Sequence, residues 1–205
     1  MEITFLIKGL IIGFSIAAPV GPIGILCIQR TISHGRKSGL YTGLGAATAD
    51  GLYGAIAAFG LTIFSTFLVG EQFWIRLIGG IFLLYLGIKT FTSKPSERIK
   101  SENHKSLLSD YFSTVFLTIT NPMTILSFVA IFAGLGLGGV KGDNLSALLM
   151  VLGVLIGSAL WWVILSGSVS LFRSKFNISS LKIVNKISGI IITIFAIIAF
   201  IGILK

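Results

Sequence analysis

The clearest chemical group in the sequence is the carboxylate of Asp50, the only acidic residue well inside a long apolar stretch of the chain. A charged side chain within the hydrocarbon of a bilayer is costly unless it is paired, hydrated or protonated. A carboxyl group placed there can take up a proton or the ammonium group of a bound solute. The alternative is a structural role, in which Asp50 caps a helix or bonds to a neighbouring hydroxyl such as that of Thr48. We expect the first role and assign Asp50 to a binding and coupling site.

Two helix-breaking motifs lie in apolar stretches of the two halves of the chain. One is the Pro-Val-Gly-Pro stretch at 19–22, and the other is the Asn-Pro pair at 121–122. A proline inside a helix removes a backbone hydrogen bond, and in lipid the freed groups must be satisfied internally or line a wet cavity. Paired breaks in corresponding spans indicate a transporter binding site, although two ordinary proline kinks are the alternative. The predicted site residues at these breaks are Pro19, Gly21, Pro22, Asn121 and Pro122.

The depth of these residues along the chain favours one shared site. Gly21, Asp50 and Asn121 each lie about nine or ten residues from an expected membrane surface, or ~15 Å at ~1.5 Å per helical residue. That depth is close to the midplane of a hydrocarbon core ~30 Å thick. Trp161 and Trp162 lie well inside the fifth apolar stretch, where they either wall the cavity or belong to an aromatic belt.

The elements that must position these residues are membrane helices. Hydrophobic residues make up 54% of the 205 residues, charged residues make up 11%, and the mean hydropathy is +0.98. Soluble domains carry roughly 25% charged residues, so the composition excludes a soluble enzyme, a disordered regulator and a secreted disulfide scaffold. The single Cys27 can form no internal disulfide. Six stretches can cross a bilayer, and they lie near 3–28, 40–68, 73–92, 111–136, 145–171 and 181–204.

Six spans predict an all-α polytopic membrane protein built from two inverted-topology three-helix repeats. Because three is an odd number, the two halves must run through the membrane in opposite directions, with the breaks in helices 1 and 4. We expect a single transmembrane transporter domain over 1–205, with repeat one at about 1–92, a cytoplasmic loop at 93–110 and repeat two at about 111–205. Asp110 stands where the fourth span begins, and we expect it to cap that helix.

The net charge of +9 indicates membrane topology and not nucleic-acid binding, because the basic residues lie between the apolar runs. Of the 16 Lys and Arg residues, 12 flank the connections that follow the first, third and fifth spans, beginning with Arg30, and four flank the other face. The positive-inside rule therefore places these three connections in the cytoplasm and both termini outside the cell. The same basic residues are suited to anionic lipid.

Motifs of enzyme chemistry are missing from the sequence. His34 and His104 both fall in expected loops, and there is no metal-ligand spacing, no phosphate-binding loop and no nucleophile motif. We expect no enzyme activity, no cofactor and no bound metal. Uphill transport by such a chain must draw on an ion gradient or on a partner.

The motifs, taken in order, resemble those of the LysE/RhtB-type amino-acid exporter family over essentially the whole chain. They are the stretch 18–22, the Gly-rich run 39–50 that ends in an acid, the Asn-Pro-Met stretch 121–123 and, more weakly, the Trp pair. The family often has Pro-Gly-Pro and Asn-Pro-Lys, whereas this chain inserts Val20 and replaces the lysine by Met123. The resemblance implies export of amino acids or close derivatives across the bacterial inner membrane by proton antiport.

The mechanism that we expect uses the breaks and the carboxylate together. The half-helices after Pro22 and Pro122 aim backbone N–H groups at a substrate carboxylate, Asp50 faces the ammonium or exchanges a proton for it, and the two halves rock. The second candidate is an exporter of inorganic cations or metals. We rank it below amino-acid export because an oxygen-rich cation site needs several carboxylates, and Asp50 is the only acidic residue well inside a predicted span. A non-transporting membrane scaffold ranks third. The particular substrate and assembly into a homo-oligomer are left open.

Overall fold

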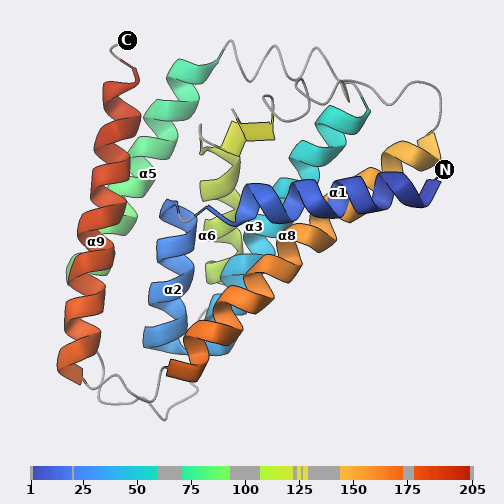
Figure 1. Ribbon diagram of the computed structural model, residues 1–205. Helices are drawn as coiled ribbons and strands as arrows, with labels where there is room; N and C mark the ends of the chain where they lie inside the picture. Colours follow the sequence, from blue (N-terminus) through green and yellow to red (C-terminus); the bar gives the residue numbers. More distant parts are fainter. Residues whose placement is uncertain are drawn as a thin grey trace.

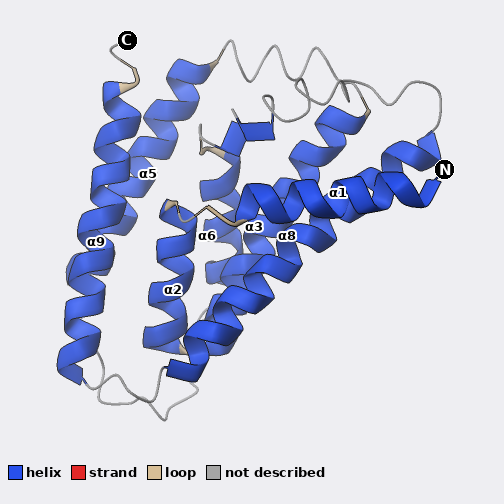
Figure 2. Cartoon of the chain, viewed as in Figure 1, coloured by secondary structure: helices blue, strands red, loops and turns tan. Residues whose placement is uncertain are grey.

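The computed structural model describes residues 2–19, 21–59, 71–92, 107–121, 124–125, 127–128, 144–172 and 178–203. Within these ranges the chain is helical and contains no strand, as Figure 2 shows. The seven helices labelled in Figure 1 are α1 (Glu2–Ala17), α2 (Pro22–His34), α3 (Arg36–Ala58), α5 (Gln72–Thr92), α6 (Leu107–Ile119), α8 (Asn144–Phe172) and α9 (Ile178–Ile201). The predicted all-α class is confirmed.

Several of these helices can cross a membrane by length and apolarity alone. Three qualify as single helices, at Phe73–Thr92, Asn144–Phe172 and Lys182–Ile201. A fourth candidate is the pair α1 and α2, which pass the test together and meet at an angle of 78°. The protein is therefore a polytopic membrane protein. Large aliphatic and aromatic side chains are exposed along these helices, as expected of surfaces that face lipid.

The helix bounds agree with the sequence for the later spans and differ for the early ones. Helices α5, α8 and α9 begin and end close to the predicted stretches. The first stretch was predicted to end at residue 28, but α2 continues to His34. His34 and Arg30 therefore belong to a helix and not to a loop. The predicted span ends at 60–68 and 129–136, and the predicted loop residues 93–106, lie outside the described residues.

A glycine explains why the predicted spans leave out the end of α2 and the start of α3. Gly35 separates the two helices and has φ 102°, a backbone conformation that glycine adopts without steric cost. Its N–H donates to the carbonyl of Thr31 at 3.0 Å and closes α2. Helix α3 then begins directly at Arg36, whose charge, with that of Lys37, led the sequence interpretation to place a loop there.

The break between α1 and α2 follows from local residue chemistry. The last bond of α1 runs from the N–H of Ala18 to the carbonyl of Phe14 at 3.0 Å. Gly21 is the N-cap of α2 in an extended conformation, with φ −100° and ψ −164°, and Pro22 stands at the first helical position. Proline is favoured there because it has no N–H to leave unsatisfied. The chain therefore turns at the predicted position.

Small residues allow α1 and α8 to pack along each other, as Figure 1 shows for the dark blue and orange helices. A Cβ placed at Gly9 or Gly13 would overlap the backbone of α8 at Met150 or Val154. Two glycines of α8 complete this interface, because a Cβ at either would overlap the backbone of α1; they are Gly153 and Gly157. The paired four-residue glycine spacings thus serve close helix approach.

The remaining helices enclose the start of α2. Helix α3 packs against both α8 and α6, α2 packs against α3 and α9, and α5 packs along α9. A buried cluster at this junction contains Ala17, Ile23, Leu26, Cys27 and Leu117, together with residues of α3, α5, α8 and α9. The start of α2 therefore lies inside the bundle, whereas Pro19 in the break before it is exposed.

Candidate functional site

A cavity of about 270 Å³ opens at the break between α1 and α2. Its volume lies just below the ~300–1,000 Å³ of pockets that hold drug-sized ligands, so it suits a small solute. The lining residues come from α1, α2, α3, α6, α8, α9 and the segment after α6; they are Ile16, Ala17, Pro19, Gly21, Pro22, Ile23, Gly24, Ala46, Asp50, Thr118, Asn121, Thr124, Ser127, Trp162 and Phe195.

The cavity brings together residues that the sequence placed in one site. Pro19, Gly21, Pro22, Asp50 and Asn121 all line it, although more than 70 residues separate the last two along the chain. Of the predicted set, only Pro122 lies outside the described residues. The sequence did not single out the neutral polar side chains of the wall, which come from helical positions that carry no distinctive motif; they are Thr118, Thr124 and Ser127.

Asp50 is buried, with 3% of its surface exposed, and one of its oxygens has a fixed partner. The hydroxyl of Ser158 donates to Oδ2 of Asp50 at 2.6 Å, and the indole N–H of Trp162 donates to that hydroxyl at 3.1 Å. The alternative partner, Thr48, instead bonds to the carbonyl of Leu44 and to the hydroxyl of Tyr111. The hydroxyl that serves Asp50 therefore comes from α8 and not from its own helix.

The start of α2 supplies backbone donors to the cavity. Among the first residues of the helix, Pro22 has no N–H, and the N–H of Ile25 donates to the carbonyl of Gly21 at 3.1 Å. The N–H groups of Ile23 and Gly24 belong to the first turn, which has no intrahelical acceptor for them, and no described side chain caps the helix. Both residues line the cavity, so the positive end of the helix dipole lies at its wall.

The second predicted break also begins a helical turn. The carbonyl of Asn121 accepts hydrogen bonds from the N–H groups of Thr124 at 3.1 Å and Ile125 at 3.2 Å. The side-chain amide of Asn121 donates to the hydroxyl of Thr124 at 3.0 Å. Asn121 is 7% exposed, so this amide is a buried polar group held beside the cavity.

The two tryptophans have different places in the structure. Trp162 is 4% exposed, lines the cavity and packs on Gly43, where a Cβ would overlap its side chain. Trp161 is not among the lining residues, and its ring meets that of Phe14 edge-to-face with centroids 5.4 Å apart. The sequence allowed both tryptophans either to line the cavity or to belong to an aromatic belt. In the structure Trp162 lines the cavity, and Trp161 belongs to the contact between α1 and α8.

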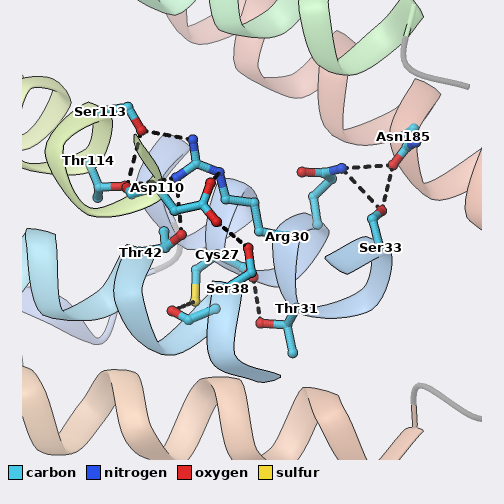
Figure 3. A network of polar contacts seen from close by, with 12 residues as sticks. Cys27, Arg30, Thr31, Ser33, Ser38, Thr42, Asp110, Ser113, Thr114 and Asn185 are labelled. Carbon is cyan, nitrogen blue, oxygen red and sulfur yellow. Dashed lines mark hydrogen bonds and ion pairs between the residues drawn. The ribbon is translucent and has the colours of Figure 1, made fainter. Parts of the chain in front are cut away.

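An ion pair between a buried arginine and a half-buried aspartate lies at the far end of α2, and the sequence did not predict it. Nε of Arg30 lies 3.2 Å from Oδ1 of Asp110, as Figure 3 shows. The two guanidinium amino groups also donate to three hydroxyls and to one backbone carbonyl; the hydroxyls are those of Thr42, Ser113 and Thr114, and the carbonyl is that of Asp110. Arg30 is 8% exposed and belongs to α2, so its assignment to a loop was wrong.

Asp110 also departs from its predicted role. It is the fourth residue of α6, within the first turn, and therefore does not precede the helix as an N-cap must. Its carboxylate accepts from Arg30 and, at 2.5 Å, from the hydroxyl of Ser38. The signal in the sequence was the spacing of hydroxyls, because Ser38 and Thr42 are four apart on α3 and so share one helix face.

A second buried polar cluster ties α2 to α9. The amide of Gln29 donates to Oδ1 of Asn185 at 2.9 Å, and the hydroxyl of Ser33 donates to the same oxygen at 3.0 Å. Gln29 and Asn185 are 4% and 1% exposed. Together with the pair of Arg30 and Asp110, this cluster fixes the end of α2 that lies away from the cavity (Figure 3).

The electrostatics of the cavity fit a small zwitterion. One wall carries a carboxylate, another carries the positive end of a helix, and the rest is apolar or neutral and polar. Among the described residues there is no group of three or more His, Cys, Asp or Glu that could hold a metal ion. Among the described residues of the lining, Asp50 has the only ionisable side chain.

Comparison with known proteins agrees with this picture. The model of the family described as "LysE type translocator" matches residues 14–202. The Bacillus subtilis (strain 168) protein named "Putative amino acid efflux protein YcgF" is 30% identical over 189 residues, which are 91% of this chain and 90% of that protein. No solved structure matches the chain.

Two further relatives carry no functional name. The Bacillus subtilis (strain 168) protein "Uncharacterized membrane protein YrhP" is 30% identical, over 84% of this chain and 87% of its own length. The Escherichia coli (strain K12) protein "Uncharacterized membrane protein YahN" is 27% identical, over 82% and 77%. Since the family match covers nearly all of a chain that is built as a polytopic helical bundle, the protein is a transporter and not an enzyme, and it belongs to the LysE type translocator family.

Proposed function

We propose that this chain exports amino acids or close derivatives across the bacterial inner membrane in exchange for protons. The observation that carries the proposal is that Asp50 and the uncapped start of α2 line one cavity. A zwitterionic amino acid carries an anionic and a cationic group on neighbouring atoms. The N–H groups of Ile23 and Gly24 suit its carboxylate, and Asp50 suits its ammonium.

The name of the Bacillus subtilis relative supports the same substrate class. The name of that protein is "Putative amino acid efflux protein YcgF", and the match covers 91% of this chain. Among the described lining residues, Asp50 is also the only one with an ionisable side chain. We therefore assign substrate binding and proton coupling to the same carboxylate.

The helix contacts support the two inverted repeats that the sequence predicts. In this proposal the first half comprises α1, α2, α3 and α5, and the second half comprises the span that begins with α6, followed by α8 and α9. Helix α1 then corresponds to α6, α3 to α8 and α5 to α9. Under this correspondence the contact of α1 with α8 in one half predicts a contact of α6 with α3, and both contacts occur, as do the contacts between the paired helices α3 and α8 and α5 and α9. We propose that the repeats rock about the cavity between them, with both termini outside the cell.

The test is efflux from proteoliposomes that contain the purified protein and a radiolabelled amino acid, with and without an imposed proton gradient. A panel of amino acids identifies the substrate. The wild type should release it faster when protons can enter in exchange. Asp50→Asn should remain folded and lose the gradient-driven efflux, because an amide neither exchanges a proton nor neutralises an ammonium. Asp50→Glu should retain part of the activity, since the charge moves by about one bond length.

A matched control is Glu71→Gln, which removes a carboxylate that lies outside the cavity lining. It should transport like the wild type. Efflux by Asp50→Asn at the wild-type rate and with the wild-type proton dependence would contradict the coupling role. Movement of divalent cations, read with an enclosed metal-sensitive dye, in the absence of any amino-acid efflux would instead establish the second candidate, an inorganic cation exporter.

A further inference from the structure

We propose that Ser158 and Trp162 are positioning residues that confine the coupling proton to a single oxygen of Asp50, Oδ1. The inference rests on the proposed function, since it concerns how the same carboxylate alternates between a proton and a substrate ammonium. Its starting point is the chain of two hydrogen bonds that ends at Oδ2 of Asp50.

The direction of both hydrogen bonds follows from the chemistry of the groups. An indole N–H is only a donor, and a serine hydroxyl has a single hydrogen to donate. Because Trp162 donates to the hydroxyl of Ser158, that oxygen acts as an acceptor on this side. Its one hydrogen is therefore available for Asp50, and it is given to Oδ2 at 2.6 Å. Oδ2 is an acceptor in this arrangement and is the unfavourable oxygen for a proton.

The second oxygen of Asp50 is in a different situation. Oδ1 receives no hydrogen bond from the described residues, whereas Asp50 itself lines the cavity. A proton on Asp50 must therefore reside on Oδ1, and a substrate ammonium must approach that same oxygen. The two ligands exclude each other at one atom. Mutually exclusive binding of this kind is the minimal requirement for exchange of a proton against an amino acid.

Packing holds the two positioning residues in place. Ser158 and Trp162 are four residues apart on α8, so both lie on one face of the helix, and they are 0% and 4% exposed. The Trp162 side chain packs against Gly43, where any Cβ would overlap it. Gly43 and Asp50 are two turns apart on α3, which therefore provides both the space for the indole and the carboxylate that it acts on.

The other ionisable groups on the neighbouring helices have partners of their own or are exposed. On α8 itself the sequence has no ionisable side chain. The groups with less exposed side chains are Tyr53 on α3, which donates to the carbonyl of Ile119; Tyr111 on α6, which bonds Thr48; Cys27 on α2, which donates to the carbonyl of Gly39; and the ion pair of Arg30 and Asp110. The exposed groups are Lys8 of α1, His34 of α2, Arg36, Lys37 and Tyr41 of α3, and Lys182 and Lys186 of α9.

The decisive variant is Trp162→Phe, which keeps an aromatic ring and removes only the indole N–H. Without that N–H the hydroxyl of Ser158 can turn away from Oδ2, so that a proton can also reside on Oδ2. A proton on either oxygen neutralises the carboxylate and competes with the ammonium, so the competition persists and its midpoint moves to higher pH. Trp161→Phe is the matched control, because the neighbouring Trp161 does not line the cavity. Ser158→Thr keeps the hydroxyl and should behave like the wild type, whereas Ser158→Ala should behave like Trp162→Phe.

The measurement is the KM of the transported amino acid in proteoliposomes as a function of pH, on the face where the substrate binds. Competition at one oxygen raises KM by about tenfold for each unit of pH below the midpoint, with an unchanged maximal rate. The wild type, Trp161→Phe and Ser158→Thr should share this slope and one midpoint. Trp162→Phe and Ser158→Ala should keep the slope and move the midpoint to higher pH at equal protein abundance, because the charged carboxylate loses a fixed donor. A wild-type midpoint in both of these variants would overturn the proposal.

An infrared measurement tests the hydrogen bonds without any transport. The carbonyl band of protonated Asp50, identified by its loss in Asp50→Asn, reports whether Oδ2 accepts a hydrogen bond. It should move to higher frequency in Ser158→Ala and change in Trp162→Phe. If it stays unchanged in both, the positioning role is wrong. If it changes as expected but no amino acid is transported by the wild type, the proposed function fails while the assignment of the proton to Oδ1 stands.

Discussion

Arg30 and Asp110 form a half-buried ion pair between residues 80 positions apart in the sequence, with 3.2 Å between Nε and Oδ1. The pair joins the C-terminal part of α2 to the first turn of α6. Arg30 is eight residues after Pro22, or ~12 Å along the helix axis at ~1.5 Å per residue. Helix α2 is therefore anchored by charge at one end and lines the cavity with its other end.

Removal of one partner of this pair should destabilise the fold more than removal of both. Arg30→Met leaves the Asp110 carboxylate with the single hydroxyl of Ser38, and we expect a loss of about 3 kcal/mol. Asp110→Asn should cost less, because the guanidinium keeps its bonds to three hydroxyls. Thermal unfolding of the purified protein in detergent measures the effect. Losses that simply add in the double variant would show that the two charges are not coupled.

The glycine contact between α1 and α8 makes a second prediction. Gly13→Ala should lower the melting temperature, because the new Cβ would overlap the backbone at Val154. Gly167→Ala is the matched control on α8, since a Cβ there meets nothing within 4 Å. The control should be neutral or slightly stabilising, as alanine is favoured over glycine in a helix by about 1 kcal/mol. Equal melting temperatures for the two variants would contradict the close packing.

The cavity can be filled without disturbing the fold. A Cβ at Gly21 meets no heavy atom within 4 Å, and the backbone there is extended, with φ −100°, so we expect Gly21→Leu to insert and fold, with its longer side chain directed into the cavity. Because Gly21 lines the cavity, the added side chain should occupy the substrate volume and abolish efflux. Gly167→Leu controls for a large residue outside the cavity. Normal efflux by Gly21→Leu would place the transport path elsewhere.

The orientation predicted from the charges can be tested by cysteine labelling. In a Cys27→Ala background, Thr92→Cys at the end of α5 and Ser179→Cys near the start of α9 should react with a membrane-impermeant reagent only when the cells are opened and the reagent reaches the cytoplasmic face. Asn144→Cys at the start of α8 should react with a membrane-impermeant reagent on intact cells. All three native residues are exposed. The reverse pattern would mean that the termini are cytoplasmic.

Local chemistry in the sequence was sufficient to place the helix breaks. Pro22 can begin a helix but cannot continue one, and the apolar runs on either side have no other state available in lipid. For the same reason the composition predicted a polytopic helical protein, and Asp50 was recognisable as an isolated charge in an apolar run. These properties depend on neighbours in the chain, so no folded structure is needed to see them.

Only the tertiary structure decided which groups meet across helices. The hydroxyl that bonds Asp50 comes from Ser158, 108 residues away, and no spacing within either helix specifies that contact. Arg30 was predicted to lie in a loop because the first apolar stretch was taken to end near residue 28. Its burial became favourable through a carboxylate and hydroxyls supplied by α3 and α6. The sequence determines which residues are able to pair, whereas helix packing determines which of them do, because such contacts join residues that only the fold brings within hydrogen-bonding distance.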